Sequence, residues 1–309
     1  PDYAYAGYEL FDLEFAAGDL DAAERAIQTL SAHLDNGHVR QRGIRLAARR
    51  GEHKRALDLF WKMWAVNDDD IEPFRAALRV LEETGWAADA GRVIDGVVLE
   101  PEVNAHAGTL WVDVRAAGRF RPGRFRAFAR VLANGAAGQR AAQALLRHYA
   151  AKKSARRLQS LLRRHGEALR ADSETHGLAC YALVTVNAPR AAVQWFGDWR
   201  THVDPQPWAL LNLVSALRDL GRDEQAAEVS RLALSRPRDH TAGEHAAWLA
   251  ADAALTGDRN GAGKLLDQAD LEEFGAYYQF VCKVARGVLA AERGLVASRA
   301  EAFRQARDE

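Results

Sequence analysis

The sequence predicts an all-α protein that is built from repeated pairs of antiparallel helices. A short motif recurs along the chain: a Gly, a small residue five positions later, and an apolar residue four further on. The separation is 33 residues from Gly18 to Gly51 and 34 residues from Gly51 to Gly85. A fixed period of this length is typical of solenoids, in which each helical hairpin stacks on the next. We therefore expect one elongated array over residues 1–309.

The motif occurs in clear and in weaker copies. The clear copies start at Gly18, Gly51, Gly85, Gly118, Gly221 and Gly257. Weaker copies are expected near Ala150, with Ala155 as the small residue, at Asn187 and at Gly294. Residues 275–309 are expected to cap the array, because a terminal repeat has a neighbour on one side only.

The clearest copy, residues 208–237, shows why each repeat is read as two helices. Leucines recur at steps of three and four residues, which predicts a helix with one apolar face, at Leu210, Leu213, Leu217 and Leu220. Gly221 ends that helix. Asp223 and Glu224 favour the start of a second helix, because acidic side chains stabilise a helix N-terminus.

The repeat resembles that of the tetratricopeptide repeat (TPR) family, whose 34-residue unit has the same order of turn, small and large residues. The small positions are Ala23, Ala56, Ala90, Gly123, Ala155, Ala192, Ala226 and Ala262, and the large ones include Ile27, Phe60, Ile94, Phe196 and Leu266. The chain departs from the family pattern at 121–123 and at 132–138, where we expect an irregular connection. The resemblance implies a right-handed superhelical solenoid.

The resemblance also implies a concave groove that is lined by the first helix of each hairpin. The positions that face this groove in TPR proteins are rich in arginine here: Arg45, Arg49, Arg75, Arg79, Arg115, Arg140 and Arg147, with His148 beside them. A guanidinium binds a carboxylate or phosphate through two parallel hydrogen bonds, so an extended anionic ligand is expected. The alternative is that Arg75 and Arg79 pair with Glu72, Glu82 and Glu83 of their own helix.

Two aromatic residues occupy further groove positions. Tyr181 and Trp208 are expected to form an aromatic pocket for a ligand side chain. The alternative is that Trp208 packs at the start of its own helix.

A basic segment lies in the middle of the chain. Residues 114–166 hold 14 Arg or Lys and no Asp or Glu, although the whole chain has 42 of each sign. The predicted basic patch is Arg119, Arg121, Arg124, Arg126, Lys152, Lys153, Arg156, Arg157, Arg163 and Arg164. Such a patch attracts phosphates or acidic protein surfaces over about 8 Å in physiological salt. The alternative is a solvated outer face that keeps the array soluble.

Other functions are not favoured by the sequence. Phosphate-binding, dinucleotide-binding, serine-hydrolase and zinc-protease motifs are missing, so neither an enzyme nor a cofactor is expected. The histidines lack a metal-ligand spacing, and no metal is expected. No apolar run is long enough to span a bilayer. Cys180 and Cys282 lack a redox spacing, which favours two buried free thiols.

These observations predict a non-catalytic scaffold whose Arg-rich groove binds an acidic or extended protein partner. One alternative is a helical-repeat protein that binds RNA or another polyanion through residues 114–166. Another is a regulatory or docking domain of a larger enzyme or of a bacterial export complex. We expect a cytoplasmic location, with the periplasm as the alternative if a signal segment has been removed.

Overall fold

The chain is all-helical over the residues that the structure describes. The computed structural model describes residues 2–65, 69–117, 124–201, 205–237, 240–269 and 276–292, which form 17 α-helices and no strand. The chain divides into two compact units, Pro1–His148 and Tyr149–Glu309, and the boundary falls inside the ninth helix. The all-α prediction is confirmed, and one continuous superhelical array stays a prediction.

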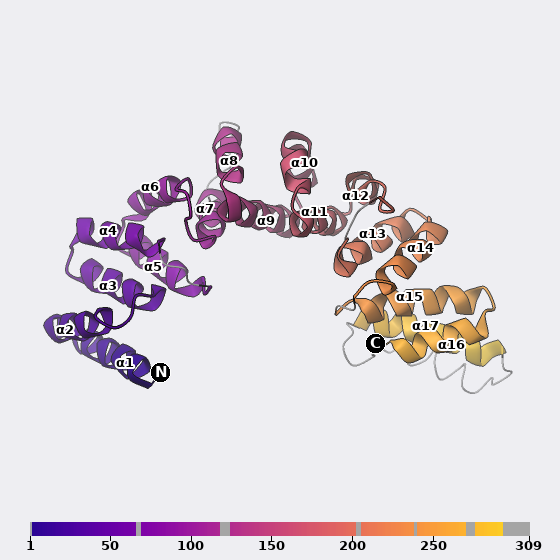
Figure 1. The fold of residues 1–309 in the computed structure, drawn as a ribbon, viewed down its shortest axis with the longest axis horizontal. Helices are drawn as coiled ribbons and strands as arrows, with labels where there is room; N and C mark the ends of the chain where they lie inside the picture. Colours follow the sequence, from indigo (N-terminus) through magenta and orange to yellow (C-terminus); the bar gives the residue numbers. More distant parts are fainter. Residues whose placement is uncertain are drawn as a thin grey trace. The chain divides into compact units, whose positions relative to one another are not determined.

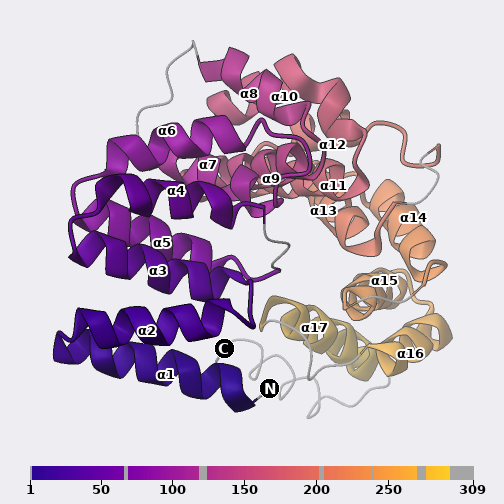
Figure 2. The ribbon, with the colours of Figure 1, turned by 60° about the vertical axis from the view of Figure 1, so that its left-hand side comes forward.

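The first unit is a row of helical hairpins (Figures 1 and 2). Its helices are α1 (Asp2–Ala17), α2 (Leu20–Ser31), α3 (Gly37–Arg49), α4 (His53–Met63), α5 (Glu72–Glu83), α6 (Ala87–Val97), α7 (His106–Ala117), α8 (Arg124–Leu132) and α9 (Gly135–Ala151). Helix α1 packs on α2, α3 on α4 and α5 on α6, and α3 also packs on α5 and α4 on α6. First helices therefore lie beside first helices, and second helices beside second helices, as a stacked array requires.

The second unit repeats this arrangement. Its helices are α10 (Ala155–Arg170), α11 (Ser173–Thr185), α12 (Pro189–Phe196), α13 (Pro207–Asp219), α14 (Asp223–Leu234), α15 (Ala242–Leu255), α16 (Arg259–Gln268) and α17 (Ala276–Glu292). The first helices α11 and α13 pack on each other, and α17 packs on α15. Of the predicted cap, 276–292 are therefore helical, whereas 293–309 lie outside the described residues.

The turns between paired helices share one backbone geometry, which explains the recurring Gly. At Gly221 φ is 68°, a left-handed conformation that strains most other residues. The N–H of Gly221 donates to the carbonyl of Arg218 at 2.8 Å, and that of Arg222 donates to Leu217 at 2.9 Å. This pair of bonds is the Schellman ending of a helix. The small residue five positions after the turn is fully buried in six copies, at Ala23, Ala56, Ala90, Ala192, Ala226 and Ala262.

The register predicted around Ala150 and Ala155 is wrong. The left-handed turn residue is Lys153, with φ of 49°, and the buried residue five positions later is Leu158. Ala155 is instead the first residue of α10 and only half-buried. The copy was predicted in the wrong register because neither the turn nor the packing position holds its usual small residue. When the repeat is counted from Lys153 as the turn residue, His148 no longer occupies a position that faces the groove in the repeat pattern.

The irregular connection expected at 132–138 is also largely absent. Helix α8 ends at Leu132 and α9 begins at Gly135, so only two residues separate them. The glycines serve close packing: a Cβ on Gly108 of α7 would lie 1.8 Å from the carbonyl oxygen of Ala137, and one on Gly138 would lie 2.6 Å from that of Leu132. These glycines let three helix backbones approach without a loop.

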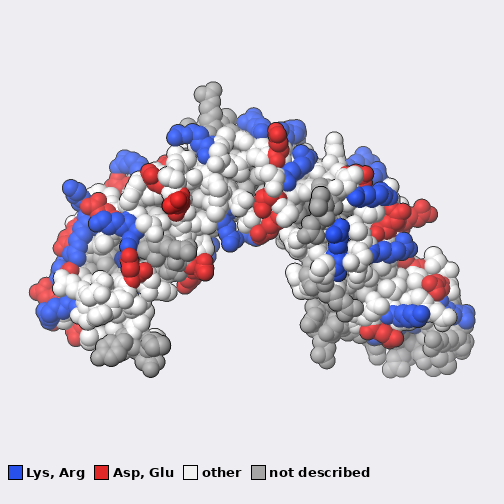
Figure 3. Space-filling view, in the orientation of Figure 1, with Lys and Arg blue, Asp and Glu red and all other residues white. Residues whose placement is uncertain are grey.

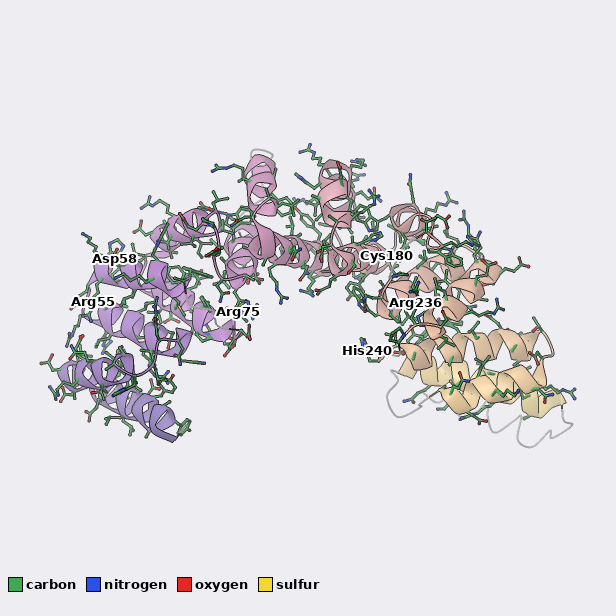
Figure 4. All side chains as sticks on the ribbon, viewed as in Figure 1. Arg55, Asp58, Arg75, Cys180, Arg236 and His240 are labelled. Carbon is green, nitrogen blue, oxygen red and sulfur yellow. The ribbon has the colours of Figure 1, made fainter. Side chains whose placement is uncertain are left out.

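Both cysteines are buried free thiols, as predicted. Figure 4 labels Cys180, which lies on α11 within the second unit. Complete burial raises the pKa of the Cys180 thiol to about 12. A thiol with so high a pKa is protonated at neutral pH and unreactive.

Candidate functional site: a cationic groove between α10 and α12

The predicted groove arginine Arg45 is held by an acidic residue of the preceding hairpin. Its Nη1 lies 2.6 Å from Oδ1 of Asp12, and Nη2 of Arg42 lies 2.6 Å from Oδ2 of the same carboxylate. The guanidinium of Arg45 also stacks 4.7 Å from the ring centre of Phe15. Asp12 thus partly neutralises this end of the predicted groove.

Three more of the predicted arginines form ion pairs inside the first unit. Arg75, labelled on α5 in Figure 4, lies 2.9 Å from Glu72, and Arg79 lies 4.0 Å from the same carboxylate. This is the intrahelical pairing that the sequence offered as the alternative. Nε of Arg115 donates to Asp95 at 2.9 Å, so this side chain ties α7 to α6.

Arg49, Arg140 and Arg147 are exposed and differ from these arginines in their pairing. None of the three makes an ion pair with a described residue. Arg49 lies on α3, whereas Arg140 and Arg147 lie on α9. They stay candidates for the groove that the repeat pattern predicts.

The structure gives Trp208 a packing role. A Cβ on Gly177 of α11 would lie only 2.8 Å from Cη2 of Trp208, so the missing side chain makes room for the indole. Trp208 is half-buried where α13 meets α11. Tyr181, one turn further along α11, is 43% exposed. Trp208 therefore fits the packing alternative, and only Tyr181 presents a largely exposed ring.

A groove with a charge excess lies between the second helices α10 and α12 and has a volume of about 1100 Å³. Four arginines and one glutamate line it: Arg163, Arg164, Arg170, Arg190 and Glu167. All five side chains are exposed. Arg163 and Arg190 make no ion pair with any residue in the described part of the chain. The groove is therefore a concentration of positive charge that the protein itself leaves available.

One end of the groove lies where the C-terminal parts of α10 and α12 meet. Near the ends of the two helices, a Cβ on Gly166 would lie 3.3 Å from Cζ3 of Trp195, and the guanidinium of Arg170 stacks 4.0 Å from the Trp195 ring. Nε1 of Trp195 donates to the carbonyl of His176 at 3.1 Å, which fixes the indole on α11. At the other end, Ala155 and Asn187 lie on opposite sides of the groove. Helices α10 and α12 thus run in the same direction along the groove.

A kink in α10 shapes the wall of the groove. His165 has a non-helical φ of −126° and ψ of 15°, immediately before Gly166. Burial, followed by the charge of Arg164, lowers the pKa of His165 below its ordinary value. His165 is therefore neutral at pH 7, and the positive charge of the groove comes from arginine alone.

The N-terminal ends of both helices add positive potential to the groove. The first turn of α10 contains Arg156 and Arg157, the first turn of α12 contains Arg190, and neither turn contains an acidic residue. A helix N-terminus already carries a partial positive charge, so cations there oppose helix stability. That arrangement favours a ligand that supplies the missing negative charge.

The rest of the predicted basic patch divides into two groups. Lys152, Arg156 and Arg157 are exposed beside the groove, whereas Lys153 donates to the carbonyl of Thr185 at 2.8 Å. Arg119 and Arg121 lie outside the described residues, as do the side chains of Arg124 and Arg126.

Sequence reasoning identified Arg163 and Arg164 but missed Arg170 and Arg190. Arg190 lies in the next hairpin, and only the stacking of hairpins brings it opposite α10. The sequence signal that could have pointed to Arg190 was its position in the first turn of a helix that has no acidic residue there.

The described residues contain no group of three or more His, Cys, Asp or Glu that could hold a metal ion. Within the same residues, no helix is both long and apolar enough to cross a membrane. No model of a known protein family matches the chain, and a search of curated proteins finds no match either.

Proposed function

We propose that this protein is a non-catalytic helical-repeat module of the TPR type, whose α10–α12 groove binds an acidic segment of another protein. The observation that carries the proposal is the local excess of four arginines over one glutamate in a chain with balanced charge. Complementary charge guides the approach of a partner and sets its register, and the paired guanidinium geometry suits carboxylates. In this proposal the helix pairs form a right-handed superhelix, as the TPR resemblance implies.

A protein segment fits the groove better than a single-stranded nucleic acid does. Binding of single strands relies on exposed aromatic rings on which bases stack. Trp195 is 5% exposed and covered by Arg170, and the nearby Tyr149 is 1% exposed. The floor instead contains small and aliphatic side chains, such as Leu162 and Leu183. Such a floor accepts an aliphatic side chain that is flanked by carboxylates.

The proposal is tested by reversing the two unpaired groove arginines in the double variant Arg163→Glu/Arg190→Glu. The probe is a fluorescein-labelled oligoglutamate, and its affinity is measured by fluorescence anisotropy at low salt. Each reversal removes an attraction and adds a repulsion, so we expect the affinity to fall about a hundredfold, or about 2.8 kcal/mol.

The matched control is Arg222→Glu/Arg231→Glu, which changes the net charge equally on exposed positions of the α14 hairpin. We expect this control to bind within about twofold of the wild type at equal salt. An equal loss in both double variants would show non-specific attraction and reject the groove. Tighter binding of oligouridylate than of oligoglutamate, lost in the same groove variant, would instead identify a nucleic-acid ligand.

A further inference from the structure

The α10–α12 groove has room for a helix. In the first unit the second helices α4 and α6 pack directly on each other, whereas α10 and α12 diverge around a groove of about 1100 Å³. Figure 1 shows the labelled α10 and α12 standing apart. A helix about 11 Å across would fill this volume over about 12 Å, which is about two turns. The eight-residue helix α12 has about the same length.

The residues that line the groove form three strips, a cationic strip on each wall and an apolar strip between them. Arg163 lies on the α10 wall, and Arg190 lies on the α12 wall. Between them, the apolar floor is lined by Leu162, Leu183 and Trp195, all three of them buried. A ligand that satisfies all three strips needs one apolar side chain with carboxylates on both sides.

We propose that the ligand is a short amphipathic α-helix, in which an apolar residue is flanked by acidic residues three or four positions before and after it. This inference rests on the proposed function. Residues three positions before and three positions after the apolar residue lie on the same face of a helix, about 60° to either side of it. The apolar side chain then points to the floor, and the carboxylates reach Arg163 and Arg190. This is the helix-in-groove mode of recognition, in which side chains at helical spacing anchor the ligand.

The direction of the bound helix follows from electrostatics. Residues at the N-termini of α10 and α12 line the same end of the groove, and each N-terminus carries a partial positive charge. The C-terminus of a ligand helix carries a partial negative charge and belongs at this end. The ligand helix therefore runs antiparallel to α10.

The experiment compares two short alanine-based peptides that contain the segment Glu-Ala-Ala-Leu-Ala-Ala-Glu. One peptide is locked as a helix by a lactam bridge on its far face, and the other has a proline beside the leucine, which prevents a helix. We expect the locked helix to bind the intact protein about tenfold more tightly. Equal affinities would overturn the helix inference and leave the proposed function standing. Failure of both peptides and of oligoglutamate to bind would reject the proposed function as well.

The variant Gly166→Val tests the apolar floor separately. The added side chain enters the space beside Trp195, and we expect the advantage of the locked helix to disappear while oligoglutamate binds as before. Retained oligoglutamate binding also shows that the variant is folded. The matched control is Gly263→Val on α16, where the added Cβ meets nothing within 4 Å. Unchanged preference of Gly166→Val for the locked helix would contradict the assigned floor.

Discussion

Arginines at the start of the chain and arginines of the α10–α12 groove have opposite surroundings. Arg50 lies 2.7 Å from both Asp21 and Glu24, and Arg55, labelled on α4 in Figure 4, lies 2.6 Å from Glu24. Arg163 makes no ion pair within the described chain. Figure 3 shows blue and red side chains interleaved over the first hairpins, and several blue side chains around a red one at α10.

The comparison indicates that an arginine of this protein joins helices together where acidic residues lie close to it, and stays available for a ligand where they do not. The first helices bring acidic residues to the first basic ones, so these arginines join helices together. Residues 114–166 contain no acidic residue, so the arginines at the start of α10 stay available. An arginine count alone therefore does not locate a binding surface.

The largest stability effect is expected where the pairing is strongest, at Glu24. This side chain is 16% exposed and bonded to two arginines, and the hydrogen bond from Arg55 is the main reason that its pKa is lowered. We expect Glu24→Gln to lower the free energy of unfolding by about 1 to 2 kcal/mol in urea denaturation. The matched change Glu167→Gln in the groove should stay within about 0.5 kcal/mol.

The effect of Glu24→Gln also has a defined pH dependence. A carboxyl whose pKa is lowered by folding stabilises the protein above its ordinary pKa and loses that contribution as the pH falls through the lowered value. The difference from wild type should therefore shrink in acid. Equal destabilisation by Glu24→Gln and Glu167→Gln would erase the distinction between the two regions.

A smaller effect is expected at His165, in the wall of the groove. Because folding lowers its pKa, the unfolded chain takes up a proton first as the pH falls below the ordinary histidine value. His165 thus contributes stability above that value and loses it towards lower pH. We expect the unfolding free energy of the wild type to fall more between pH 7 and 5 than that of His165→Gln. Parallel pH profiles of the wild type and His165→Gln would mean that folding does not lower the pKa of His165.

The hairpin pattern was predictable wherever Gly and Ala occupy their usual positions. Gly18 and Gly221 both adopt the left-handed turn, and the small residue that follows each is buried. The register of the copy at Lys153 was predicted wrongly because a lysine adopts the left-handed φ there and a leucine fills the packing position.

The candidate site was less predictable than the fold. The basic segment pointed to Arg163 and Arg164, but the facing Arg190 comes from another hairpin, and its approach depends on how α10 and α12 diverge. The resemblance to TPR proteins directed attention to first helices. There, Arg45 and Arg115 turned out to hold carboxylates of the chain itself.

The most direct test observes the guanidinium groups by NMR during a titration with oligoglutamate. We predict that the Nε–Hε signals of Arg163 and Arg190 shift and saturate together, while those of Arg45, Arg50 and Arg75 stay in place. Shifts at Arg45, Arg49 and Arg75 with unmoved Arg163 and Arg190 would contradict the account and return the binding surface to the first helices.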